Sequence, residues 1–180
     1  MMKRFGWYVP VLVVVLLGVA LAVYFIPENG ATPSRLNDVP RRFGDFQLTG
    51  TITGQEALSS VEKMHIGSPG DMKGAVIATY KDTSGRKVQL WVADFEDNEV
   101  ATTTLLEMVE GIKKYPEMGF SAPEKHPLNG MDVYVSDGAG GVNTFWAEKN
   151  RVVYLLISQV SHDDAFTATQ IFMEQYRQTV

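Results

Sequence analysis

The sequence contains no cysteine. Structural disulfides, thiolate metal sites, covalently attached c-type haem and an N-terminal lipid-modified cysteine are therefore excluded. The sequence also lacks a strong positive charge, because its formal net charge is −5 and Lys and Arg form no long run. Nucleic-acid binding has no electrostatic support in such a chain.

Recognisable catalytic and metal-binding motifs are missing as well. No G-x-S-x-G elbow occurs, and none of the three histidines (His65, His126 and His162) has another histidine at a metal-binding spacing. His162, Asp163 and Asp164 are typical of a helix first turn, where acidic side chains complement the helix dipole. We therefore expect a protein that is not an enzyme and has no cofactor or metal. An enzymatic function would be supported if two or more of the following side chains converged in one cleft: His65, His162, Asp94 and Asp137.

Two other polar features have ordinary structural explanations. The cluster of Asp94, Glu96 and Asp97 at a strand-to-helix turn is typical of a solvated cap rather than of a catalytic dyad. The run Gly138-Ala139-Gly140-Gly141 joins two predicted strands and leads into no helix, so it predicts a hairpin turn rather than a phosphate-binding loop.

What the sequence does contain is a long apolar stretch near its start. Residues 5–26 carry no charged side chain, and a helix of this length can span the roughly 30 Å hydrocarbon core of a bilayer. Aromatic side chains near both ends predict contact with the membrane–water interface. They are Trp7, Tyr8, Tyr24 and Phe25.

The charges around this stretch favour one orientation. Lys3, Arg4 and the amino terminus predict a cytoplasmic N-terminus, although Arg35, Arg41 and Arg42 on the other side partly offset the bias. The C-terminal part would then be extracytoplasmic, in the periplasm or outside the cell. A cleaved signal peptide is the alternative, because Ala20-Leu21-Ala22 has the small-x-small form that signal peptidase accepts.

Composition divides the rest of the chain. Residues 1–26 are predicted to be a cytoplasmic head and signal-anchor, 27–45 a linker rich in proline and glycine, and 46–180 one soluble domain. The alternative for the linker is that part of it packs along the domain edge.

Hydrophobic periodicity in the domain predicts the order β-α-β-β-α-β-β-β-α. The helices are expected at residues 54–66, from Asp97 or Asn98 to Lys114, and from Ser161 to Tyr176, with capping residues at their starts. Because strands and helices do not alternate strictly, the pattern favours an α+β fold with an antiparallel sheet and about three helices, mainly on one face.

Aromatic side chains on the predicted strands raise the question of what covers the second sheet face. A second helix layer is one answer. The other is an exposed face that binds a partner protein or a small ligand. The candidate interface residues are Tyr80, Trp91, Tyr134, Trp146 and Tyr154.

Three segments, TGQEALSSVEKMHIG, LWVADFEDNEVATTTLLEMVEGI and FWAEKNRVVYLLIS, resemble a family of uncharacterised membrane-anchored extracytoplasmic α+β proteins of bacteria and archaea. The strand, turn, strand and amphipathic helix of residues 143–176 are similar in plan to the PsbP/Mog1 group. That resemblance implies an accessory or assembly role.

Together these features predict a non-catalytic, single-pass accessory or assembly subunit of a larger membrane protein complex. Its expected partners are the lipid bilayer and integral membrane subunits, with the soluble domain docking on extracytoplasmic proteins. The alternative is a membrane-tethered domain that binds a small ligand.

Overall fold

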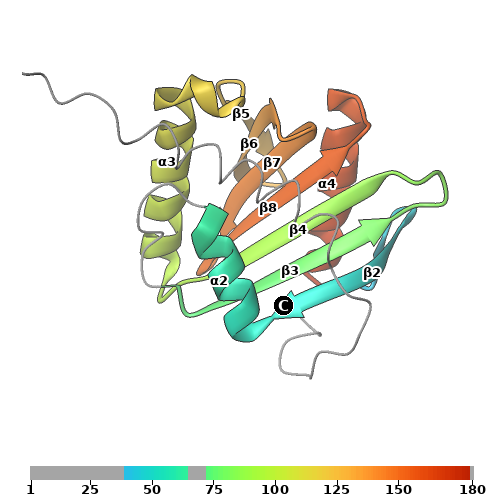
Figure 1. Ribbon diagram of the computed structural model, residues 1–180, viewed down its shortest axis with the longest axis horizontal. Helices are drawn as coiled ribbons and strands as arrows, with labels where there is room; N and C mark the ends of the chain where they lie inside the picture. Colours follow the sequence, from blue (N-terminus) through green and yellow to red (C-terminus); the bar gives the residue numbers. More distant parts are fainter. Residues whose placement is uncertain (1–38, 65–71, 179–180) are drawn as a thin grey trace, which may run out of the picture.

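The computed structural model describes residues 39–64 and 72–178 (Figure 1). They form an eight-stranded antiparallel sheet in the order β1-β2-β3-β4-β8-β7-β6-β5, with three α-helices packed on it. This confirms the predicted α+β domain with an antiparallel sheet. The predicted membrane helix at residues 5–26 and its four interfacial aromatic residues lie outside the described residues. Within the described ranges, no helix is both long and apolar enough to cross a bilayer.

The elements follow the chain in this order: β1 (Arg42–Phe43), β2 (Phe46–Thr53), α2 (Gly54–Met64), β3 (Gly74–Lys81), β4 (Lys87–Asp94), α3 (Asn98–Lys114), the 3₁₀ turn η2 (Pro116–Met118), β5 (Glu124–Leu128), β6 (Met131–Gly138), β7 (Gly141–Glu148), β8 (Arg151–Ser158) and α4 (His162–Tyr176). Strands β1 to β4 form one meander and β5 to β8 another, and the two meet where β4 pairs with β8.

Capping residues begin two of the helices as the sequence predicts. The Asp97 carboxylate accepts a hydrogen bond of 2.9 Å from the Val100 backbone N–H at the start of α3. At the start of α4, the Ser161 hydroxyl accepts from the Asp164 N–H at 3.2 Å and donates to the Asp164 carboxylate at 2.8 Å. Each cap satisfies a backbone donor that has no partner inside the helix.

Helices cover both faces of the sheet (Figure 1). Ala75, Ile77 and Trp91 pack with α2, whereas Val76 and Leu90 belong to the core around α4. Because neighbouring residues of a strand point to opposite faces, α4 lies across the sheet from α2. Helix α3 shares the α2 side, where it covers β7 and β8. Of the two answers for the second face, the structure therefore shows the second helix layer.

Phe172 of α4 is the centre of the core on the α4 face. Its ring lies 5.2 Å from that of Phe43, 6.1 Å from that of Trp146 and 5.4 Å from that of Tyr176, all between centroids. All four side chains are fully buried. Phe43 comes from β1, so the strand closest to the N-terminus completes this core.

This packing corrects the predicted boundary between linker and domain at residues 45 and 46. Val39 and Phe43 are buried in the core, and the Tyr80 hydroxyl donates a 2.9 Å hydrogen bond to the Pro40 carbonyl. Residues 39–45 therefore belong to the domain, as the alternative for the linker had it. The apolar anchors Val39 and Phe43 are too few and too widely spaced to produce a periodic pattern in the sequence.

Two edge strands have no clear signal in the sequence. β1 is only two residues long, and β5 contains Pro127, which cannot donate a backbone hydrogen bond. Proline is tolerated in β5 because, among the described strands, this one ends the sheet and pairs with β6 alone. His126 therefore lies on an edge strand.

Candidate functional site

The five aromatic residues predicted as an interface are inside the domain. Tyr80 and Trp146 are fully buried on the α4 face, whereas Trp91 and Tyr134 are buried on the α2 and α3 face, where Tyr154 is partly buried. The Trp91 and Tyr154 rings meet edge to face with centroids 5.0 Å apart. The prediction of an exposed aromatic surface is therefore wrong for these residues. The physical reason is the second helix layer, which covers the sheet face whose cover the sequence did not determine.

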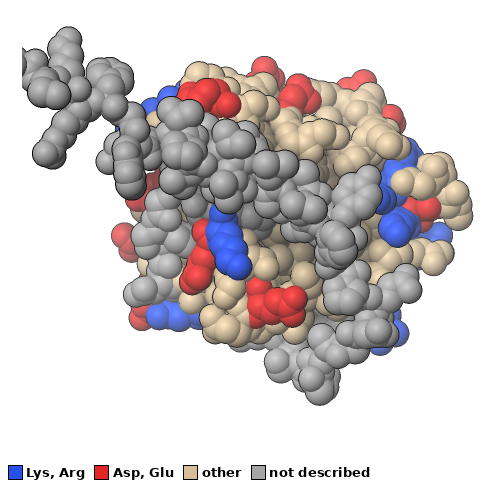
Figure 2. Space-filling model, viewed as in Figure 1, with Lys and Arg blue, Asp and Glu red and all other residues tan. Residues whose placement is uncertain are grey.

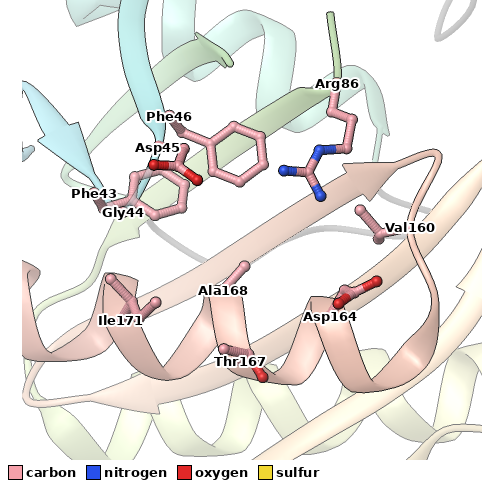
Figure 3. Close-up of a pocket in the computed structure, with 10 residues that line it drawn as sticks. All are labelled: Phe43, Gly44, Asp45, Phe46, Arg86, Val160, Asp164, Thr167, Ala168 and Ile171. Carbon is pink, nitrogen blue, oxygen red and sulfur yellow. The ribbon is translucent and has the colours of Figure 1, made fainter. Parts of the chain in front are cut away.

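A groove with a volume of about 170 Å³ opens between the β1–β2 turn, the β3–β4 hairpin and the N-terminal half of α4 (Figure 3). It opens to solvent and has both polar and apolar walls. Its lining residues are Phe43, Gly44, Asp45, Phe46, Arg86, Val160, Asp164, Thr167, Ala168 and Ile171.

Helix α4 forms one wall of the groove through residues 164, 167, 168 and 171. These positions share one side of a helix because they follow the spacing i, i+3, i+4 and i+7. The opposite wall approaches closely at Gly44, whose φ of +51° is a conformation that side chains disfavour. A Cβ atom at Gly44 would lie 3.8 Å from the Ile171 side chain, so glycine is required here by the backbone conformation rather than by lack of space.

Arg86 brings a positive charge to the groove in a fixed position. Its Nε atom donates to the Asp82 carboxylate at 2.5 Å, and its guanidinium carbon lies 5.6 Å from the centre of the Phe46 ring. A carboxylate on one side and an aromatic face on the other hold the plane of a guanidinium. Figure 3 shows this group extending from the hairpin towards α4.

Several contacts fix the Asp82 carboxylate in the position where it pairs with Arg86. The Asp82 side chain is only 2% exposed, and its carboxylate also accepts hydrogen bonds from the backbone N–H groups of Ser84 and Arg86 at 2.9 Å and from the Ser84 hydroxyl. Burial alone would raise the pKa of Asp82, but the hydrogen bonds from Arg86 and Ser84 outweigh it and lower that pKa to about 2. Asp82 therefore stays ionised, and its ion pair fixes the position of the Arg86 guanidinium on the hairpin.

The terminal nitrogens of Arg86 make no hydrogen bond to the part of the chain that the structure describes. They remain able to donate to an anion, and a guanidinium suits a carboxylate or phosphate with two parallel hydrogen bonds. Asp45 and Asp164 add two carboxylates to the same lining. The groove can therefore hold both charges of one small molecule, together with an apolar part against Phe46 and Ile171.

One pair from the set of possible catalytic residues does come together. The His162 Nε2 atom lies 2.7 Å from the Asp137 carboxylate, but the two side chains are 61% and 58% exposed and neither lines the groove. Asp94 instead bonds Arg151 at 2.6 Å, and His65 lies outside the described residues. The condition set for an enzyme, convergence in one cleft, is therefore not met by this pair.

Other polar side chains have structural roles. The Gly138–Gly141 run forms a tight hairpin turn between β6 and β7, as predicted, with positive φ at Ala139 and Gly140. Beneath it, the Asn143 amide donates to the carbonyls of Ser136 and Gly138 at 3.0 Å, and Tyr154 donates to the Asn143 side chain. Burial raises the pKa of Tyr154, so it stays a neutral donor. In residues 39–64 and 72–178, no three His, Asp or Glu side chains group as metal ligands. On the face shown in Figure 2, acidic side chains are scattered rather than gathered in one patch.

Sequence reasoning missed the groove because its walls come from three separate segments. Only the hairpin has a local signal: Asp82-Thr83-Ser84-Gly85 is typical of a turn, and an aspartate at the start of a turn often accepts a hydrogen bond from the backbone after it. That Phe46 and α4 would lie beside this turn is decided by the tertiary structure.

No protein-family model and no curated protein matches this sequence. Among solved structures, the chain is similar to the extracellular domain of PknH from Mycobacterium tuberculosis, with a TM-score of 0.45 and 13% sequence identity, over 74% of this chain and 86% of that one. A similarity at this level carries no argument about function. The resemblances to the membrane-anchored family and to the PsbP/Mog1 group remain predictions.

Proposed function

We propose that this protein is a membrane-tethered, extracytoplasmic domain that binds a small zwitterion in the groove between the β1–β2 turn and α4, without transforming it. The observation that carries the proposal is Arg86, held by Asp82 and Phe46 with its terminal nitrogens available for an anion. A ligand site needs few polar groups, provided that they converge in a concave surface with apolar walls.

The charges and size of the groove support this class of ligand. A carboxylate or similar anion would bind Arg86, and an amine would bind near Asp45 and Asp164. The volume of about 170 Å³ is below the roughly 300–1,000 Å³ of sites for drug-sized molecules, which points to a compact ligand of amino-acid size.

The tether is supported by the sequence of residues 5–26, an uncharged stretch of the length that spans a bilayer. Lys3 and Arg4 on its N-terminal side support a cytoplasmic N-terminus and an extracytoplasmic domain. A ligand-binding domain held in this way would sample the compartment outside the cytoplasm while staying at the membrane.

Binding is tested with the full-length protein in mild detergent, by titrating a panel of free amino acids and other small zwitterions in a calorimeter. We expect at least one compound to bind. The Arg86→Gln variant should bind it at least tenfold more weakly, because a charge-assisted hydrogen bond is worth about 1.5–3 kcal/mol. Lys87→Gln is the matched control, since Lys87 is exposed on the same hairpin and does not line the groove. Equal binding by wild type and Arg86→Gln would rule out this groove as the site.

The tether is tested separately by washing membranes with alkaline carbonate. The chain should stay in the membrane pellet, and external protease should digest the C-terminal domain of intact spheroplasts. Release of a fragment that begins at Val23 would instead favour the cleaved signal peptide.

The accessory-subunit hypothesis is a second proposal. It is supported by Gly18, Ala20 and Ala22, which would let the predicted membrane helix approach other helices closely. Its test is native size after gentle detergent extraction: co-migration with other membrane subunits supports it, and a species that contains this chain alone contradicts it.

A further inference from the structure

Among the described residues, β1 covers only the start of the outer edge of β2. β1 pairs only with the start of β2, through Phe43 opposite Phe46 and Arg42 opposite Gln47, and the Leu48 N–H donates to the Arg41 carbonyl at 2.9 Å. In the described ranges, no strand pairs with the outer side of residues 49–53. Figure 1 shows β2 along the margin of the sheet.

This edge lacks two of the features by which proteins protect exposed strands, charged side chains and proline, although a β-bulge interrupts its pairing with β3 between Leu48 and Gly50. Residues 49–53, TGTIT, contain no charge and no proline. The opposite edge of the sheet is different, because β5 carries Glu124, Lys125 and Pro127. Charged residues and proline on an edge strand prevent pairing with another chain. The contrast indicates that the β5 edge is closed to pairing, whereas the part of β2 that follows the bulge is available for it.

We propose that residues 50–52 pair with the same residues of a second copy of this chain, antiparallel across a twofold axis, so that two sheets become one. In this register Thr51 lies opposite Thr51 of the partner copy. Gly50 then lies opposite Ile52, whereas the bulge takes Thr49 out of regular pairing. Threonine pairs across strands are favourable, and isoleucine opposite glycine has room for its side chain. A twofold interface requires such a self-complementary surface.

The two ends of this edge also complement each other in charge. Arg41 and Arg42 lie beside the start of β2, and Glu56 lies in the first turn of α2, just past its end. All three side chains are exposed. Antiparallel pairing brings the β1 end of one copy beside the α2 end of the other. Each copy would therefore place two arginines near a glutamate of its partner. These opposite charges favour a second copy of this chain over an unrelated strand.

The chain has no cysteine, so single cysteine variants report directly on this contact. The full-length protein in mild detergent or in membranes is oxidised with copper phenanthroline. Thr51→Cys should form a disulfide-linked dimer, because directly opposed residues of an antiparallel pair have Cα atoms about 4.5–5.5 Å apart, within disulfide range. Thr102→Cys, on the exposed side of α3, is the control and should stay monomeric.

A second variant tests whether the edge supplies the association. Thr51→Lys places like charges opposite each other and should weaken dimerisation at least tenfold in analytical ultracentrifugation, while Thr102→Lys should leave it unchanged. The proposal is overturned if Thr51→Cys cross-links no faster than the control, or if Thr51→Lys dimerises like the wild type. It is equally overturned if the protein is a monomer whose amides at residues 49–53 are protected from hydrogen exchange, because its own chain would then cover the edge.

Discussion

Arg151 and Asp94 are joined by both backbone and side chain at the seam between the two halves of the sheet. They are the pair at one end of the β4–β8 ladder, and the Arg151 Nε atom donates to the Asp94 carboxylate at 2.6 Å. Arg151 also donates to the Tyr176 hydroxyl at 3.0 Å, which ties the end of α4 to this seam. Burial raises the pKa of Tyr176 to about 12 against the opposing effect of Arg151, so this hydroxyl stays neutral. The three side chains therefore connect both meanders with the α4 face.

Breaking this connection should be costly. Because both side chains are mostly buried, Asp94→Ala leaves a guanidinium without its carboxylate, and we expect a loss of about 3 kcal/mol in the free energy of unfolding. The double variant Asp94→Ala/Arg151→Met should recover at least half of that loss, since it removes the remaining charge as well. Urea denaturation of the full-length protein in mild detergent measures both values. A double variant that is less stable than Asp94→Ala would contradict this account.

The low pKa of Asp82 predicts a dependence of stability on acid. The folded-state pKa of about 2 lies below the ordinary value of 3.8, so the stabilisation is present above about pH 4 and is lost as the pH falls towards 2. Asp82→Asn should therefore flatten the decline of the urea midpoint between about pH 4 and pH 2. Asp132→Asn is the control, because Asp132 forms an exposed pair with Lys125. Equal slopes for the wild type and Asp82→Asn would contradict the prediction.

Phe172 should be among the most sensitive positions of the core. Phe172→Ala removes a fully buried ring that contacts Phe43, Trp146 and Tyr176, and we expect a loss of about 3–5 kcal/mol. Leu106→Ala is the comparison, because Leu106 on α3 is 47% exposed, and it should change the free energy of unfolding by less than about 0.5 kcal/mol. Thermal unfolding followed by circular dichroism separates the two effects. Similar melting temperatures for both variants would refute the proposed role of Phe172.

Two glycines should respond in opposite directions to alanine. A Cβ atom at Gly141 would lie 2.4 Å from the Ile157 carbonyl oxygen, which is part of the adjacent strand and cannot move aside alone. Gly141→Ala should therefore destabilise the domain by about 1–3 kcal/mol. Gly111 lies inside α3 with open space around it, so Gly111→Ala should stabilise by about 0.5–1 kcal/mol. Denaturant midpoints of the two variants should fall on either side of the wild type.

Much of the fold could be predicted because its signals are local. Alternating apolar residues identified β3, β4, β6, β7 and β8, and Asp97 and Ser161 marked the starts of α3 and α4. Each of these signals depends on residues within a few positions of one another. The edge strands β1 and β5 were missed because a two-residue strand and a strand with proline have no such period.

By itself, the sequence determined which segments are strands and helices, since backbone hydrogen bonding and side-chain periodicity act over a few residues. It could not decide which helix covers which face of the sheet, and that choice buried Tyr80, Trp91 and Trp146 instead of exposing them. Nor could it place Phe46, Arg86 and Asp164 around one groove. Only the tertiary structure decided these points, because packing joins residues that lie far apart in the chain and depends on the shapes of both surfaces.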